Sequence, residues 1–158
     1  MAPLPKLKSP DRAAKKVRNC VHSDVWGPAQ VQSLGGSEYF VTFTDEKSAV
    51  SEANFMKKKS ETLSAYKKYA RKIKTEQGIS IGEFYSNGAG NYLSKEFKDF
   101  LASEGTKRTI SVHDTPGQNI ILERLNRTLV GNARAMLLAS RLPKFLWAEA
   151  ISHAVQYG

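Results

Sequence analysis

The alternation of apolar and polar residues predicts three strands in the first third of the chain. In the clearest of them Tyr39, Val41 and Phe43 share one face, and the preceding Gly35-Gly36 supplies a tight turn. The three predicted strands are residues 17–25, 37–46 and 49–55. Their close spacing indicates a hairpin or a three-stranded meander.

A helical period replaces this alternation after residue 60. Four apolar residues recur at helical spacing, and they are Leu63, Tyr66, Ala70 and Ile73. Ser60 is expected to cap this helix and Gly78 to end it. Beyond Gly78 the pattern predicts a strand over 79–86, a short helix over 94–105 and a strand over 107–112.

A long helix is predicted towards the end of the chain. Thr115 and Gln118 form a capping box around Pro116, and the apolar stripe continues to about Ala139. The stripe consists of Ile121, Leu125, Leu129, Met136 and Leu137. Pro143 is expected to open a last helix. Strands and helices in this order predict an α/β domain with a mixed sheet.

Composition adds a hint about partners. The chain has 158 residues, a size that suits one domain, and a formal net charge of +9. We expect residues 1–15 to be a flexible basic arm and residues 16–158 to form the domain. Lysine and arginine concentrate in 6–18 and 57–74. A single run of charge usually means a solvated surface, but two clusters together with the overall excess favour contact with nucleic acid.

Other classes of protein are disfavoured. No apolar run approaches the length of a membrane span, and the N-terminal stretch lacks the apolar core of a secretory signal. The single cysteine, Cys20, excludes an internal disulfide and a zinc site built from several cysteines. We therefore expect an intracellular protein, in the nucleus or the cytoplasm, that does not enter a membrane.

The stretch FYSNGAGNY, residues 84–92, looks like a catalytic loop without a catalytic acid. It is rich in glycine and follows a predicted strand, yet its apex is Asn87. Acidic candidates elsewhere are Asp24, Asp45 and Glu123, each of which taken alone is more simply a capping or solvated carboxylate. His22 shares a strand face with Asp24 and is expected to pack or to form a hydrogen bond.

Five ordered motifs carry a resemblance to a known family. They are VHSDVWGP, YFVTFTDEKS, GNYLSKEF, HDTPGQN and ERLNRTL. Together they resemble the integrase catalytic core of copia-type LTR retrotransposons, with fungal copies most similar, from about Arg12 to the last residue. The resemblance implies a ribonuclease-H-like fold, with a five-stranded mixed sheet flanked by helices. It also implies two-metal phosphoryl transfer on DNA, in 3′-processing and strand transfer.

The resemblance also assigns the site. The family's first and last catalytic acids fall on Asp24 and Glu123, which would bind Mg²⁺ or Mn²⁺. The second falls on Asn87, and a further family acid is replaced by Asn91. Because an amide oxygen carries no charge, we expect weakened metal binding and loss of most catalysis, as in a degenerate copy.

Nucleic-acid contacts are expected on two sets of residues. They are Gln118, Asn119 and Arg127 near the site, and Lys67, Lys68, Arg71 and Lys72 on the first helix. The expected partner is DNA, with RNA as an alternative, and a second copy of the chain in a homodimer is also considered. Two alternatives stay open: an active nuclease or transferase that uses a substitute acid such as Asp45, and a domesticated interaction module without catalysis. Complete members carry a zinc module upstream and a DNA-binding region downstream, so this chain is expected to hold the core alone.

Overall fold

A five-stranded mixed sheet forms the centre of the protein. The computed structural model describes residues 20–110 and 118–157. The strands are β1 (Cys20–Trp26), β2 (Tyr39–Asp45), β3 (Ser51–Met56), β4 (Glu83–Ser86) and β5 (Lys107–Ile110). Their order is β3-β2-β1-β4-β5; β1 to β3 are antiparallel neighbours, and β4 and β5 run parallel to β1. The predicted sheet is therefore confirmed in strand number and in its mixed direction.

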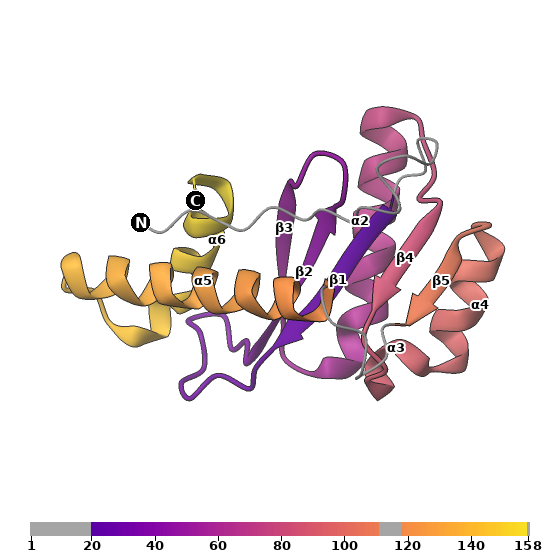
Figure 1. Cartoon of the computed structure of the whole chain (residues 1–158). Coiled ribbons are helices and arrows are strands. Elements are labelled where there is room, and N and C mark those ends of the chain that lie inside the picture. The colour runs from indigo at the N-terminus through magenta and orange to yellow at the C-terminus, as the bar shows by residue number, and fades with distance from the viewer. Residues whose placement is uncertain (1–19, 111–117, 158) are drawn as a thin grey trace.

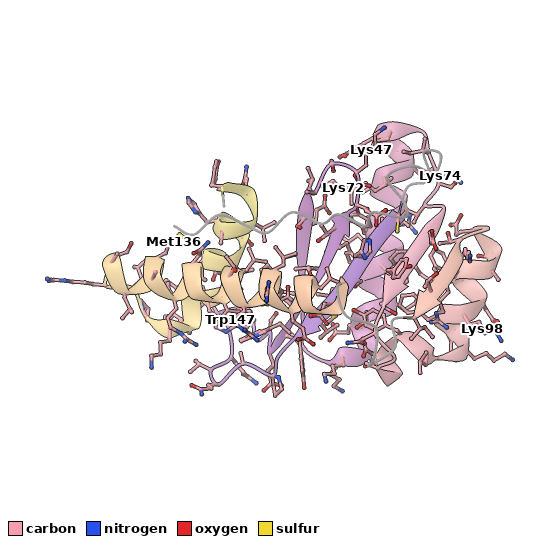
Figure 2. The ribbon with its side chains drawn as sticks, in the orientation of Figure 1. Lys47, Lys72, Lys74, Lys98, Met136 and Trp147 are labelled. Carbon is pink, nitrogen blue, oxygen red and sulfur yellow. The ribbon has the colours of Figure 1, made fainter. Side chains whose placement is uncertain are left out.

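Helices cover both faces of this sheet. They are η1 (Lys59–Glu61), α2 (Thr62–Gln77), α3 (Gly90–Leu93), α4 (Lys95–Ser103), α5 (Gln118–Ala139), η2 (Lys144–Leu146) and α6 (Trp147–Tyr157). Figure 1 shows α5 crossing in front of the sheet and α2 lying behind it. Figure 2, in the same orientation, labels Met136 of α5 at the left of the view and Lys72 and Lys74 of α2 at the upper right.

The alternation of β2 divides its residues between two cores. Val41 and Phe43 pack against α2, α3 and α4, whereas Phe40 packs against α5 and α6. The second core contains packed aromatic rings. Trp26 stacks on Phe40 with ring centroids 5.2 Å apart, and it packs edge-on against Trp147 with ring centroids 5.9 Å apart. Each face of the sheet is thus fixed by its own apolar cluster.

Two predicted boundaries are confirmed. Gly78 ends α2 in the left-handed conformation (φ 68°), and α5 ends at Ala139. The predicted helix start at Thr115 and Pro116 lies outside the described residues, as do the arm 1–15 and the end of the strand predicted over 107–112.

Other boundaries were predicted wrongly. Ser60 lies inside η1 and does not cap α2, because Glu61 precedes that helix and its carboxylate accepts the backbone N–H of Lys58 at 2.6 Å. The strand predicted over 79–86 is shortened to β4, because the carbonyl of Ile81 accepts the hydroxyl of Thr106 at 2.7 Å and joins no ladder.

The remaining differences involve short helical turns. The single helical turn α3 was not predicted; it buries Tyr92, whose hydroxyl lies 2.9 Å from that of Ser23. The last helix was predicted from Pro143, but that residue precedes η2 and α6 begins only at Trp147.

Candidate active site

Three chain segments bring Asp24, Asn87 and Glu123 to one depression of the surface. Asp24 lies near the end of β1, Asn87 directly follows β4, and Glu123 lies in α5. The two strands are parallel neighbours in which His22 pairs with Tyr85, so Asp24 and Asn87 are equivalent positions, each two residues further on. The sequence prediction named these same three residues, and the structure brings them together.

The carboxylate of Asp24 is held by a polar network. Asn126 donates from Nδ2 to Asp24 Oδ2 at 3.0 Å, and its own Oδ1 accepts the hydroxyl of Thr42 at 3.1 Å. Asn126 is 2% exposed; its bond to Thr42 is buried, and its bond to Asp24 is partly buried. The network fixes the orientation of Asp24 through a bridge between α5 and the sheet.

Burial raises the pKa of Asp24 to about 6, and the nearby charge of Glu123 acts in the same direction. Hydrogen bonds from the backbone of Val25 and from Asn126 oppose this rise because they stabilise the ionised form. A partly desolvated carboxylate beside a second carboxylate in a depression is typical of functional sites. A bound cation would relieve both the desolvation and the repulsion.

Asn87 uses its side chain in the loop itself. Its Oδ1 accepts the backbone N–H of Ala89 at 3.0 Å, a turn that asparagine and aspartate both favour. The position therefore suits an acid sterically, yet it contributes no charge here. Asn91 points elsewhere and donates to Thr62 at 3.3 Å.

Two site residues were missed by the sequence analysis, Asn126 and Arg134, which line the depression together with Arg127. Asn126 follows Glu123 by three residues on α5, and Arg134 follows Arg127 by seven, so both spacings keep a residue on the same helix face. The sequence signals for Asn126 are its place in the motif ERLNRTL and its polar character beside the apolar stripe.

The substitute acid considered from the sequence, Asp45, does not line the depression. It pairs with Val21 across the antiparallel ladder, three residues before Asp24 on β1 and so about 10 Å along the strand. Its Oδ2 accepts the backbone N–H of Ser48 at 2.8 Å. Asp45 therefore serves the turn after β2.

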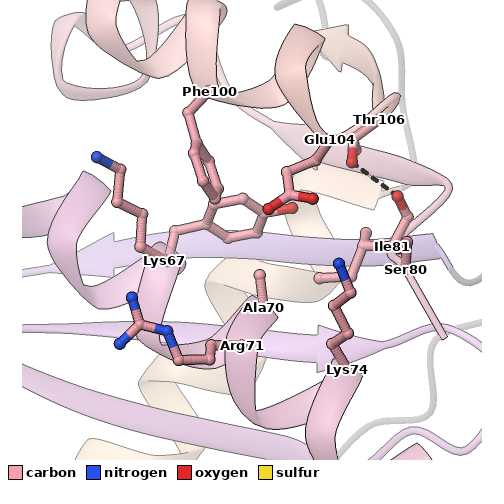
Figure 3. A pocket seen from close by; sticks show the side chains of 10 residues that line it. Lys67, Ala70, Arg71, Lys74, Ser80, Ile81, Phe100, Glu104 and Thr106 are labelled. Carbon is pink, nitrogen blue, oxygen red and sulfur yellow. Dashed lines mark hydrogen bonds between the residues drawn. The ribbon is translucent and has the colours of Figure 1, made fainter. Parts of the chain in front are cut away.

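The basic residues predicted to bind nucleic acid do not form one surface. Arg127 lines the acidic depression, whereas Lys67 and Arg71 line a separate cavity of about 260 Å³ between α2 and α4 (Figure 3). Lys68 is exposed on the same helix, and Lys72 pairs with Glu52. The side chains of residues 118 and 119 lie outside the described part. The two basic groups thus lie on opposite faces of the sheet.

Within the described ranges 20–110 and 118–157, no helix is both long and apolar enough to span a bilayer.

Comparison with known proteins agrees with this architecture. No family model matches the chain. It is 36% identical over 138 residues, 87% of its length, to the retrovirus-related Pol polyprotein from transposon TNT 1-94 of Nicotiana tabacum, of which it spans about a tenth. Its fold is similar to that of the simian T-cell lymphotropic virus intasome in complex with the PP2A regulatory subunit B56 gamma, with a TM-score of 0.68 at 16% identity over 98% of this chain and 51% of that one.

Further similarity is to the HTLV-2 integrase catalytic core domain in complex with magnesium. Its trimeric form gives a TM-score of 0.63 at 20% identity, and its dimeric form gives 0.60 at 19%. Both comparisons cover 87% of this chain and 82% of that one. Taken with the sequence relative, they show that the chain belongs to the integrase catalytic cores of copia-type retrotransposons, with a ribonuclease-H-like fold.

Proposed function

We propose that this domain is a nucleic-acid-binding integrase core whose ancestral reaction, two-metal 3′-processing and strand transfer on DNA, is impaired at Asn87. The observation that carries the proposal is the convergence of Asp24, Asn87 and Glu123 from β1, the β4 loop and α5 on one depression. Asparagine stands at the position where the family carries its second acid.

The donor set fits a divalent cation, but with less charge than the reaction requires. Asp24 and Glu123 supply two carboxylates, and the raised pKa of Asp24 reflects a site that favours added positive charge. The amide oxygen of Asn87 is neutral and accepts the N–H of Ala89. Mg²⁺ or Mn²⁺ held there would supply the positive charge that stabilises an in-line phosphoryl transfer. We infer weakened binding of such ions.

The chain's own residues position the groups around the depression. Asn126 keeps one carboxylate oxygen of Asp24 fixed and leaves the other directed away from that bond. Arg127 and Arg134 line the same depression and would attract a phosphate backbone. The protein would thus bind DNA, or RNA of similar charge, at a site with little catalytic power.

Restoring the missing acid tests the proposal. Asn87→Asp should bind Mn²⁺ more tightly in calorimetry and should gain nicking or disintegration activity on a DNA oligonucleotide, because it adds a carboxylate to the depression that Asp24 and Glu123 line. Asn91→Asp is the matched control, since it adds the same charge in the adjoining helix α3, outside the depression. Equal Mn²⁺ affinity in Asn87→Asp and the parent chain, or full activity of the parent chain, would contradict the proposal.

Nucleic-acid binding is tested separately by a gel shift at increasing salt. Binding driven by phosphate contacts weakens steeply with salt, and each lost contact lowers the slope by about one. Arg127→Gln with Arg134→Gln tests the depression, and Lys67→Gln with Arg71→Gln tests the opposite face. A salt response that neither pair changes would contradict both assignments.

We extend the proposal to assembly and location. Two of the similar solved structures are described as trimeric and dimeric forms, which supports a homodimer of this chain as a proposal. A nuclear or cytoplasmic location stays a prediction from composition. Sedimentation of the purified chain and microscopy of a tagged copy would test the two in turn.

A further inference from the structure

Cys20, His22 and Glu46 bring one ligand atom each to the same point beside β1. Cys20 and His22 are two residues apart on the strand, so their side chains lie on one face. Glu46 follows β2 directly, and its backbone N–H donates to the carbonyl of Cys20 at 2.9 Å, which places it opposite that residue. The backbone register alone therefore makes the three side chains converge.

The separations of their ligand atoms match those of a tetrahedral zinc site. Cys20 Sγ lies 3.6 Å from His22 Nε2, which lies 3.2 Å from Glu46 Oε1, and all three atoms are within 4.8 Å of one another. A tetrahedral zinc ion with ordinary bond lengths separates sulfur from nitrogen by about 3.6 Å and nitrogen from oxygen by about 3.3 Å. The three side chains need little rearrangement to take up one ion.

The same distances disfavour a catalytic triad. A cysteine nucleophile activated by histidine requires the thiol on one ring nitrogen and the carboxylate on the other. Here both contacts involve Nε2 of His22. A single cation at the common point would satisfy thiolate, imidazole and carboxylate together.

The surroundings hold the ring and leave a route for an ion. His22 stacks on Tyr85, with ring centroids 4.9 Å apart, which fixes the imidazole plane. Cys20 is 3% exposed and His22 is fully buried, whereas the Glu46 side chain is 16% exposed. An ion would therefore enter past the carboxylate.

We propose that Cys20, His22 and Glu46 form a binding site for Zn²⁺ or a similar borderline-soft dication, with water at the fourth position. Thiolate and imidazole ligands select such ions, whereas Mg²⁺ and Mn²⁺ prefer the all-oxygen set of Asp24, Asn87 and Glu123. Binding converts the Cys20 thiol to thiolate and releases its proton to solvent. The ion would tie the start of β1 to the segment after β2.

Cobalt provides a readout that reports sulfur ligation. The purified full chain, freed of metal with EDTA and dialysed, is titrated with CoCl₂ and then with ZnCl₂. We expect one equivalent of Co²⁺ to produce near-ultraviolet sulfur-to-cobalt charge-transfer absorption, which Zn²⁺ then abolishes. Cobalt at the all-oxygen depression gives no such band, so the two sites are distinguished.

Two variants make the test decisive. Cys20→Ser should remove the band, and Glu46→Gln should weaken Zn²⁺ binding at least about tenfold, because a charged ligand is lost. Glu149→Gln, which alters an exposed carboxylate on α6, is the matched control and should bind as the parent chain does. Circular dichroism checks that each variant folds. If Cys20→Ser, which alters a buried residue, fails to fold, the zinc affinity of Glu46→Gln alone decides the test.

The proposal is overturned if the parent chain shows no charge-transfer band, or if the band persists in folded Cys20→Ser. It is also overturned if Glu46→Gln binds Zn²⁺ as tightly as the parent chain. In any of these cases the cluster is a hydrogen-bonded core histidine and nothing more.

Discussion

Replacing Asp24 with asparagine should stabilise the fold above neutral pH while removing a carboxylate from the candidate site. The folded protein raises the pKa of this group from 3.8 to about 6, with burial as the main cause. The folded state therefore keeps its proton to a higher pH than the unfolded chain does. Stability is lost as the pH rises from about 4 through about 6, because the charge must then be held partly out of water.

The size of the effect follows from the two pKa values. At about 1.36 kcal/mol per pH unit, a rise from 3.8 to about 6 corresponds to about 3 kcal/mol of unfolding free energy above pH 7. Because Asp24 is partly exposed, solvent screening reduces this value, and we expect Asp24→Asn to gain about 1–3 kcal/mol. Asparagine retains an oxygen that can accept the bond from Asn126, so the network should survive.

Urea unfolding followed by tryptophan fluorescence measures this gain, with EDTA present so that no divalent cation masks the charge. The difference between Asp24→Asn and the parent chain should be largest at pH 7.5, about half as large near pH 5, and small at pH 4. Asp99→Asn, on the exposed side of α4, is the control and should change stability by no more than about 0.5 kcal/mol. A destabilised Asp24→Asn, or a gain equal at pH 5 and pH 7.5, would refute the reasoning.

Four further variants test the structure around the site by the same urea unfolding. Asn126→Ala should cost about 1–3 kcal/mol, because it removes the hydrogen bonds that Asn126 makes to Thr42 and Asp24; a neutral result would show that the network does not form. Leu129→Ala should cost about 2–5 kcal/mol, since this side chain is fully buried beneath α5, and a loss below 1 kcal/mol would contradict that packing. Replacement of glycine by alanine at two positions should change the free energy of unfolding in opposite directions. Gly131→Ala should gain about 0.5–1 kcal/mol in a helix with open space around it, whereas Gly27→Ala, at φ 132° and with its Cβ 2.6 Å from Tyr39, should destabilise strongly.

Features with a regular period could be predicted from the sequence. The alternation through Val41 and Phe43 predicted β2, and the stripe through Leu125 and Leu129 predicted α5 to its last residue. The element α3 could not be predicted, because four residues carry no helical period. The boundaries of strands and helices also depend on contacts with residues far away in sequence, as the shortened β4 shows.

The candidate site was predicted in part. Asp24, Asn87 and Glu123 were found through motifs, and the structure places them together, but their roles stay predictions. Asn126 was missed although it lies in the motif ERLNRTL, because a polar residue beside an apolar stripe is equally compatible with the surface and with the interior. The approach of Glu46 to Cys20 depends on strand register, which no local pattern specifies.

The separation of the site residues along the chain has a consequence for biosynthesis. The hairpins of β1, β2 and β3 join neighbouring segments and can form while the ribosome is still translating, whereas the pairing of β1 with β4 spans some sixty residues and α5 comes later still. Asp24 and Glu123 are 99 residues apart in sequence, so the two carboxylates do not meet until α5 has been translated. A nascent chain can therefore form its hairpins before the carboxylates of Asp24 and Glu123 come close enough to repel each other.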